Sequence, residues 1–349
     1  MQSKTTVRRG VTALEVVVSM TIVGLLMTIL LPALHRVRES ARKAQCAGNL
    51  KEIGLAMAGF ESVQGHLPGI ATEVVSRSAL DPRIGFDHQC AWISVHAQLL
   101  PYLDHANLAA KIDFSEQRPN SYLPPSSSVN AAALQIHVPV FNCPSDGLIQ
   151  GGCSYRVSVA NVSYPRAIRG DLDSVFFWTD GYGSSSEGRL WEGTKIEQIL
   201  DGLSHTVFAS ERVVGDGYSG AYNSYRDIAI LDQVPQIPDD AVHAACQFSR
   251  SAVIADESAV GTTWLYAGFA HTQYNHVLPP NSRLPDCASS GGRGQFVQGG
   301  AVAARSLHFS GVNVLFGDGA VRFTSENIDT SVWREAATVA SGNLHQGNF

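Results

Sequence analysis

The sequence predicts an α+β protein in which a long N-terminal helix packs on an antiparallel, β-rich head with long loops. Three observations lead to this prediction. Residues 11–31 are almost entirely apolar, and residues 32–65 repeat apolar side chains at helical spacing. The remainder of the 349-residue chain contains short β-branched and aromatic runs separated by Gly, Asp and Ser, and only 16% of the chain is charged. This composition favours a loop-rich β head over a helical one.

Residues 11–31 are long enough, at about 1.5 Å per residue, to cross the roughly 30 Å hydrocarbon core of a bilayer. Lys4, Arg8 and Arg9 precede this segment, which places the N-terminus in the cytoplasm and the head outside. Glu15 is the single ionisable side chain within it. A carboxylate there costs roughly 2.5–3.5 kcal/mol on insertion scales, so Glu15 either pairs with a cation or lies at the membrane interface.

Residues 32–65 are expected to continue the helix outside the membrane as an amphipathic segment. Pro32 is expected to kink it, and Gly65 and Pro68 are stop signals. Residues 66–349 then form the head. The apolar stripe consists of Leu34, Val37, Ala41, Ala44, Ala47, Leu50, Ile53, Met57 and Phe60.

Within the head, strands are expected at residues 155–160, 175–178 and 206–211, and a short helix at residues 99–108. Residues 215–305 show no clear period and many turn residues, so a long insertion is expected there. The net charge of −6 and the lack of a basic face exclude nucleic acid as a partner.

Six cysteines in an exported chain permit up to three disulfides, with fifteen connectivities that the sequence does not resolve. Cys143 and Cys153 are the closest pair, and closing that loop would contribute roughly 2.5–3 kcal/mol. They are therefore the disulfide candidates, with buried free thiols as the alternative. The cysteines are Cys46, Cys90, Cys143, Cys153, Cys246 and Cys287.

The segment from Gly10, G-V-T-A-L-E, resembles the processing site of type IV prepilins and type II secretion pseudopilins. In that family a prepilin peptidase cuts after the glycine and methylates the new amine. By resemblance, residues 1–10 are a leader, Val11 carries the methylated amine, and Glu15 pairs with that amine on a neighbouring subunit. The family's usual Phe is Val here, and its usual Thr-Leu-Ile/Val-Glu is Thr-Ala-Leu-Glu.

Five further motifs resemble the domain of unknown function 1559 family of planctomycete bacteria. They are R-K-A-Q-C-A-G-N-L-K-E-I-G before G-H-L-P-G, F-N-C-P-S-D, S-Y-R-V-S-V-A-N, I-L-D-G-L-S-H-T-V-F-A-S-E and H-F-S-G-V-N-V-L-F-G-D-G-A-V-R-F. The last is a His-x9-Asp-Gly signature formed by His308, Asp318 and Gly319. The resemblance implies prepilin-type processing and a pilin-like head, and it implies no established activity.

The closing signature predicts a hairpin, because two alternating runs flank Gly317, Asp318 and Gly319. Asp318 would accept hydrogen bonds from backbone amides, and Gly319 would supply a positive φ. A first strand of about 13–17 Å would hold His308 away from Asp318. We therefore expect this signature to be structural, with a metal or catalytic pair as the alternative.

No catalytic residues, metal ligands or cofactors are assigned from the sequence. The residues Asp201, Ser204 and His205 superficially suggest a hydrolytic triad, but neighbours on a strand point to opposite faces. Calcium is a more plausible ion than zinc, because Asp171, Asp173 and Asp180 offer hard oxygen ligands, while a solvated acidic turn is the alternative.

We therefore expect a non-enzymatic, pilin- or pseudopilin-like structural or secretion-apparatus subunit. It would sit in the inner membrane as a single-pass protein with its head in the periplasm, or in an extracytoplasmic filament. Its partners would be the bilayer, other pilin-like subunits and the prepilin peptidase/N-methyltransferase. The alternative is a membrane-tethered module that binds a glycan or protein without polymerising, and an anchored hydrolase is the weaker alternative.

Overall fold

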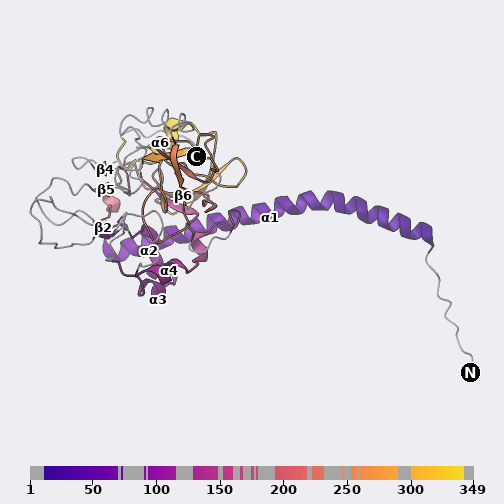
Figure 1. Ribbon diagram of the computed structural model, residues 1–349, viewed down its shortest axis with the longest axis horizontal. Coiled ribbons are helices and arrows are strands. Elements are labelled where there is room, and N and C mark those ends of the chain that lie inside the picture. The colour runs from indigo at the N-terminus through magenta and orange to yellow at the C-terminus, as the bar shows by residue number, and fades with distance from the viewer. Residues whose placement is uncertain are drawn as a thin grey trace, which may run out of the picture. The chain divides into compact units, whose positions relative to one another are not determined.

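The computed structural model divides the chain into two compact units, Met1–Ala44 and Gln45–Phe349. Figure 1 shows the arrangement of the labelled elements within them. The structure describes residues 12–69, 72–73, 90–91, 93–114, 129–147, 152–159, 166–167, 174–176, 178–179, 193–217, 222–231, 246, 253–257, 260–289 and 300–341.

Helix α1 (Ala13–Gln64) is the long helix expected from the sequence, and it runs through Pro32. It ends where Gly65 adopts a φ of 77°, with its amide donating to the carbonyl of Glu61 at 2.7 Å. Glycine tolerates this conformation, and such a residue commonly terminates a helix by satisfying one of its last carbonyls. The predicted end near Gly65 is confirmed.

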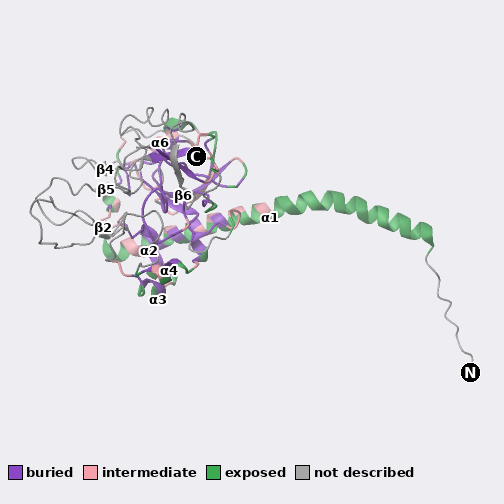
Figure 2. Cartoon of the chain, in the orientation of Figure 1, coloured by how far each residue is buried: buried purple, intermediate pink, exposed green. Residues whose placement is uncertain are grey.

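In the first unit, residues 12–38 of the chain are all exposed, although most of them are apolar (Figure 2). Among the described residues, α1 is the one helix that is long and apolar enough to cross a membrane. This helix is consistent with a single membrane anchor or a signal sequence.

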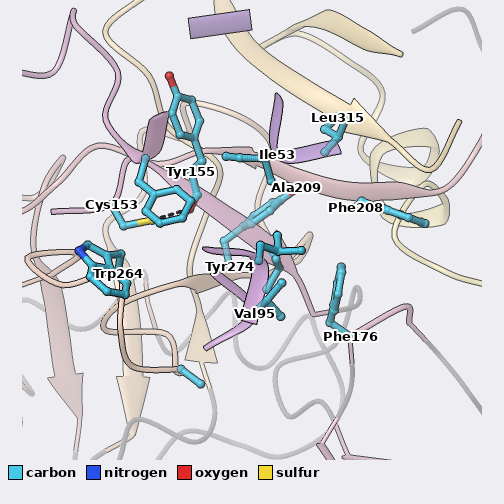
Figure 3. Packing of buried hydrophobic residues seen from close by; sticks show 14 of the residues in the cluster. Ile53, Val95, Cys153, Tyr155, Phe176, Phe208, Ala209, Trp264, Tyr274 and Leu315 are labelled. Carbon is cyan, nitrogen blue, oxygen red and sulfur yellow. Dashed lines mark hydrogen bonds between the residues drawn. The ribbon is translucent and has the colours of Figure 1, made fainter. Parts of the chain in front are cut away.

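In the second unit, the last five turns of α1 bury one face. Cys46, Leu50, Ile53, Ala56 and Met57 are 0–2% exposed. Their spacing of three and four residues places them on one stripe. It includes Leu50, Ile53 and Met57 of the predicted apolar stripe. Gly54 lies against Leu315, since a Cβ added there would be 2.8 Å from its Cδ1. Figure 3 shows Ile53 among core residues of the head, including Tyr155, Ala209 and Leu315.

Five of the described strands form a sheet against which this part of the helix packs. Its order is β13-β12-β6-β3-β9, and all neighbours are antiparallel except β3 and β9, which are parallel. The strands are β3 (Tyr155–Ser158), β6 (Val207–Glu211), β9 (Gln273–Tyr274), β12 (Gly311–Phe316) and β13 (Val321–Ser325).

A four-stranded sheet, in the order β11-β10-β7-β8, occupies much of the stretch expected to be an insertion. Its strands β10 and β7 are parallel and its other pairs antiparallel. The head is therefore built on mixed sheets in which antiparallel pairs predominate, and the predicted α+β, pilin-like architecture is confirmed. These strands are β7 (Ile228–Leu231), β8 (Val253–Glu257), β10 (Asp286–Ser289) and β11 (Gly300–Ala301).

Short elements complete the described part of the head. The helix expected at residues 99–108 is three consecutive pieces. Of the strand expected at residues 175–178, the described residues 175–176 form a bend and Trp178 begins β5. The short helices are α2 (Val95–Leu99), η1 (Leu100–Leu103), α3 (Ala106–Ala109), α4 (Ala131–Leu134), η2 (Pro139–Phe141), η3 (Ile196–Gln198) and α6 (Thr330–Glu335). The remaining strand pairs are β1 (Thr72–Glu73) with β2 (Cys90–Ala91), and β4 (Arg166–Ala167) with β5 (Trp178–Thr179).

The closing hairpin is confirmed. Strands β12 and β13 pair from Gly311 opposite Ser325 to Leu315 opposite Val321. At the turn, Gly319 has a φ of 78°, and Asp318 Oδ1 accepts from the amide of Ala320 at 2.9 Å. The Asp-Gly pair therefore closes the hairpin as the sequence predicts.

Candidate functional site

Four ligand-type side chains from distant parts of the chain meet inside the head. Cys46 comes from α1, Cys143 from the turn after η2, Glu211 from the end of β6, and His308 from the turn before β12. One sulfur, nitrogen or oxygen atom of each lies within 4.8 Å of the others. All four residues are buried. We call this set the Cys-Glu-His cluster.

The Glu211 carboxylate is held by one neighbouring residue on β12. Oε2 accepts the backbone amide of Asn313 at 2.7 Å, and Oε1 accepts the Asn313 side-chain amide at 2.8 Å. Because both carboxylate oxygens are fixed, a buried acid is tolerated at the end of a core strand.

His308 completes the contacts of Glu211. Its Nε2 lies 3.2 Å from Oε1 of Glu211 and 3.6 Å from Sγ of Cys143. The backbone amide of His308 donates to Ser306 Oγ at 3.1 Å, which fixes the turn. His308 and Asp318 therefore belong to different environments, as expected: the histidine faces the core, and the aspartate closes the exposed end of the hairpin.

The disulfide pairing expected from the sequence is wrong. Cys143 bonds to Cys46, and the two Cα atoms are 5.1 Å apart. Cys153 is a buried free thiol whose S–H donates to the carbonyl of Tyr155 at 2.8 Å. Proximity in sequence failed as a guide because α1 brings Cys46 to Cys143 across 97 residues. A second bridge joins Cys246 to Cys287.

Asn49 provides a second link between the helix and the Cys143 loop. Its Nδ2 donates to the carbonyl of Asn142 at 3.0 Å and to the hydroxyl of Tyr155 at 3.2 Å. Burial raises the pKa of Tyr155 well above its usual value, and the negative charge of Glu211 raises it further. Tyr155 therefore stays protonated beside the cluster.

Three buried charged side chains, beginning with the residue after Glu211, connect the five-stranded and four-stranded sheets. Asp286 on β10 pairs with Arg212, which follows β6, at 2.9 Å and with Arg305 at 2.8 Å. Burial opposes ionisation of Asp286, but Arg305 and Arg212 outweigh it and lower its pKa. The side chains of all three residues are 0–1% exposed, so the single negative charge of Asp286 offsets part of the positive charge of the two arginines inside the protein.

The predicted processing residues are only partly visible. Gly10 and Val11 lie outside the described residues. Glu15 lies in the first turn of α1, where Oε2 accepts the amide of Thr12 at 2.8 Å and its hydroxyl at 3.0 Å. The amide of Glu15 in turn donates to Thr12 Oγ1 at 3.4 Å. Thr-x-x-Glu is thus a capping box, a signal that was present in the sequence.

Two further predicted groups are placed as follows. Asp171, Asp173 and Asp180, the calcium candidates, lie outside the described residues.

Ser204 and His205 lie in a turn before β6, where Ser204 Oγ is 3.1 Å from His205 Nδ1. Ser204 and His205 are therefore not separated by a strand, contrary to the prediction. Asp201 Oδ2 instead accepts bonds from Thr338 and Ser341 at the C-terminal end.

Three residues of this region, Cys46, Glu211 and Asn313, were not predicted from the sequence as site residues. Each lies inside one of the quoted motifs: Cys46 in R-K-A-Q-C, Glu211 at the end of T-V-F-A-S-E, and Asn313 in H-F-S-G-V-N. Their position inside these motifs was the available signal.

Comparison with known families supports that grouping of motifs. The chain matches the family described as "Protein of unknown function (DUF1559)" over residues 35–331. This range includes all four residues of the Cys-Glu-His cluster. No curated protein and no solved structure matches the chain.

Proposed function

We propose that this chain, which belongs to the DUF1559 family of proteins of unknown function, is a pilin- or pseudopilin-like structural subunit. In this proposal, prepilin peptidase cleaves after Gly10 and the mature chain assembles through its N-terminal helix. The carrying observation is that α1 exposes an apolar surface with one carboxylate in its first turn.

The exposed apolar surface calls for a bilayer or neighbouring helices. Leu14, Met20 and Leu25 are 73%, 70% and 65% exposed, and similar side chains follow along this part of α1. Exposed apolar area on this scale is unfavourable in water. A single-pass inner-membrane location with the head in the periplasm satisfies it, and so does packing among like helices in a filament.

The geometry of Glu15 suits pairing with an amine in such an assembly. Both contacts from Thr12 use Oε2, so Oε1 can accept a hydrogen bond from another chain. A methylated amine on Val11 of a neighbour would neutralise the carboxylate in an apolar environment, where an unpaired charge is costly. The proposed role is structural and includes no catalytic step.

The first test is the mass of the native protein. We expect a mature chain that begins at N-methylated Val11. Gly10→Val should leave the precursor uncut in the membrane, because the peptidase site is lost. Gly24→Ala is the matched control, since a Cβ at Gly24 meets nothing within 4 Å, and it should be processed normally. An intact mass that still contains residues 1–10 would contradict the processing step.

A second test, shearing of cells combined with crosslinking in membranes, distinguishes a subunit that assembles from a protein that is only tethered to the membrane. A subunit of a surface filament is released with the sheared fraction, and a subunit of a short periplasmic assembly crosslinks to its own copies in membranes. Recovery only as an uncrosslinked membrane protein would support the tethered binding module instead.

A further inference from the structure

We propose that, when the Cys46–Cys143 disulfide is reduced, the two thiolates bind one zinc ion together with His308 and Glu211. The inference goes beyond the structural role proposed above and does not depend on assembly. It gives the Cys-Glu-His cluster two forms, one closed by a sulfur–sulfur bond and one closed by a metal.

The ligand set is of the kind that zinc prefers. Thiolate, imidazole and carboxylate are its usual protein ligands, and four protein ligands in a tetrahedral arrangement are typical of a structural zinc site. Hard cations such as calcium favour sites made of oxygen atoms alone. The two sulfurs and one imidazole of this cluster therefore point to zinc.

Two of the distances that do not involve the disulfide bond already fit a tetrahedron. With bonds of about 2.3 Å to sulfur and about 2.0–2.1 Å to nitrogen or oxygen, sulfur and nitrogen lie ~3.5 Å apart and nitrogen and oxygen ~3.3 Å apart. The observed separations are 3.6 Å from Cys143 Sγ to His308 Nε2 and 3.2 Å from His308 Nε2 to Glu211 Oε1. Two edges of the site are thus preformed.

The neighbouring residues support such a site. The Asn313 backbone and side-chain amides orient the Glu211 carboxylate, as groups around metal ligands commonly do. Asn49 holds the Asn142 carbonyl next to α1, so helix and loop stay together without the disulfide. The sulfurs can then separate by side-chain rotation while the backbone remains in place.

The interconversion requires a dithiol reductant. One thiolate of the reductant attacks a sulfur of the disulfide, and its second thiol resolves the mixed disulfide. Two electrons pass to the cysteines, which become two thiols, while the reductant becomes a disulfide. Zn²⁺ then displaces the two thiol protons to solvent, and His308 coordinates through Nε2 with its proton on Nδ1.

Cys153, the free cysteine among those whose side chains the structure describes, is a poor competitor for the metal. Burial raises the pKa of Cys153 to about 12, and a thiol must lose its proton to bind zinc. Cys246 and Cys287 form the other bridge, away from the cluster. These residues therefore supply matched controls in the same chain.

The test is metal binding by the full-length protein in detergent. The protein is reduced with excess dithiothreitol, desalted under nitrogen, and titrated with Zn²⁺ or Co²⁺. We expect one metal per reduced chain, none per oxidised chain, and a thiolate-to-cobalt charge-transfer band. Cys46→Ser, His308→Ala and Glu211→Gln should each weaken binding at least about tenfold, whereas Cys246→Ser and Cys153→Ser should retain it.

Several results would overturn the proposal. One is a reduced chain with alkylatable Cys46 and Cys143 that binds no stoichiometric cobalt. Another is loss of binding in Cys246→Ser but not in Cys46→Ser, which would place the metal elsewhere. Circular dichroism shows whether the reduced chain stays folded. A chain that unfolds on reduction and does not refold when zinc is added also contradicts the proposed site.

Discussion

The two units distribute polarity in opposite ways. The described part of the first unit exposes apolar side chains such as Leu25 and Leu30, at 65% and 53%. The second unit buries charged ones, including Glu211, Arg212 and Asp286, at 0–1%. Each arrangement is unfavourable by itself. Partners inside the protein offset part of the buried charge of the head, and in our proposal lipid or other subunits cover the exposed apolar helix. The comparison therefore separates the stability of the head from the proposed assembly.

The largest expected effect concerns the buried ions. Asp286→Ala leaves Arg212 and Arg305 without the carboxylate that both contact, and we expect it to destabilise the head by about 3–5 kcal/mol. Urea unfolding of the full chain in detergent, followed by the fluorescence of the buried Trp264 and Trp333, measures this. Asp318→Ala, in an exposed turn, is the control and should cost far less. Equal losses would mean that the ion cluster contributes little.

The second prediction compares the two parts of α1 directly. Leu50 is fully buried and Leu25 is 65% exposed. Leu50→Ala removes core packing and should cost about 2–5 kcal/mol, whereas Leu25→Ala should leave unfolding of the head unchanged. The same urea experiment gives both values. A comparable loss from Leu25→Ala would show that the first part of the helix also stabilises the head.

The sequence was sufficient for elements defined by local signals. The apolar stripe and Gly65 define the second part of α1 and its end, and the Asp318-Gly319 pair defines the closing turn. In each case a short-range pattern carries the information.

The features that the sequence did not predict depend on contacts between distant residues. Strand β7 is buried on every residue, so it lacks the alternation that identifies a half-exposed strand. Its parallel partner β10 follows after a long connection. The Cys46–Cys143 bond and the Cys-Glu-His cluster likewise appear only once α1 packs on the head. Cysteine connectivity cannot be deduced from sequence alone.

The third prediction concerns acid and the buried His276. Its Nδ1–H donates to the carbonyl of Trp333 at 2.7 Å, and Nε2 accepts from the Tyr274 hydroxyl at 2.9 Å. Burial lowers its pKa to about 3, although the bond to Trp333 opposes this. The neutral ring with its proton on Nδ1 satisfies both nitrogens.

The unfolded chain takes up a proton near pH 6.5, but the folded chain does so only near pH 3. Stability from His276 is therefore fully present above pH 6.5 and is lost as the pH falls toward 3. The expected slope is up to about 1.4 kcal/mol per pH unit. Urea midpoints between pH 7 and 4.5 measure it, and His276→Gln should flatten the slope. An unchanged slope in that variant would assign the acid sensitivity to other groups.

The last prediction has the smallest expected effect on stability. It compares two variants that distinguish the two roles of Glu15 in the exposed part of the helix. Glu15 caps its own helix through Thr12, and in our proposal it also pairs with an amine on a neighbour. Thr12→Val removes the hydroxyl contact but keeps the carboxylate, so it should weaken the helix end by about 1 kcal/mol and preserve self-association. Glu15→Ala removes both roles: it should insert into membranes at least as well, because no charge is buried, yet crosslink less. Crosslinking yields in membranes compare the two variants. If both lose self-association equally, helix capping accounts for the effect; if neither loses it, the carboxylate has no part in assembly.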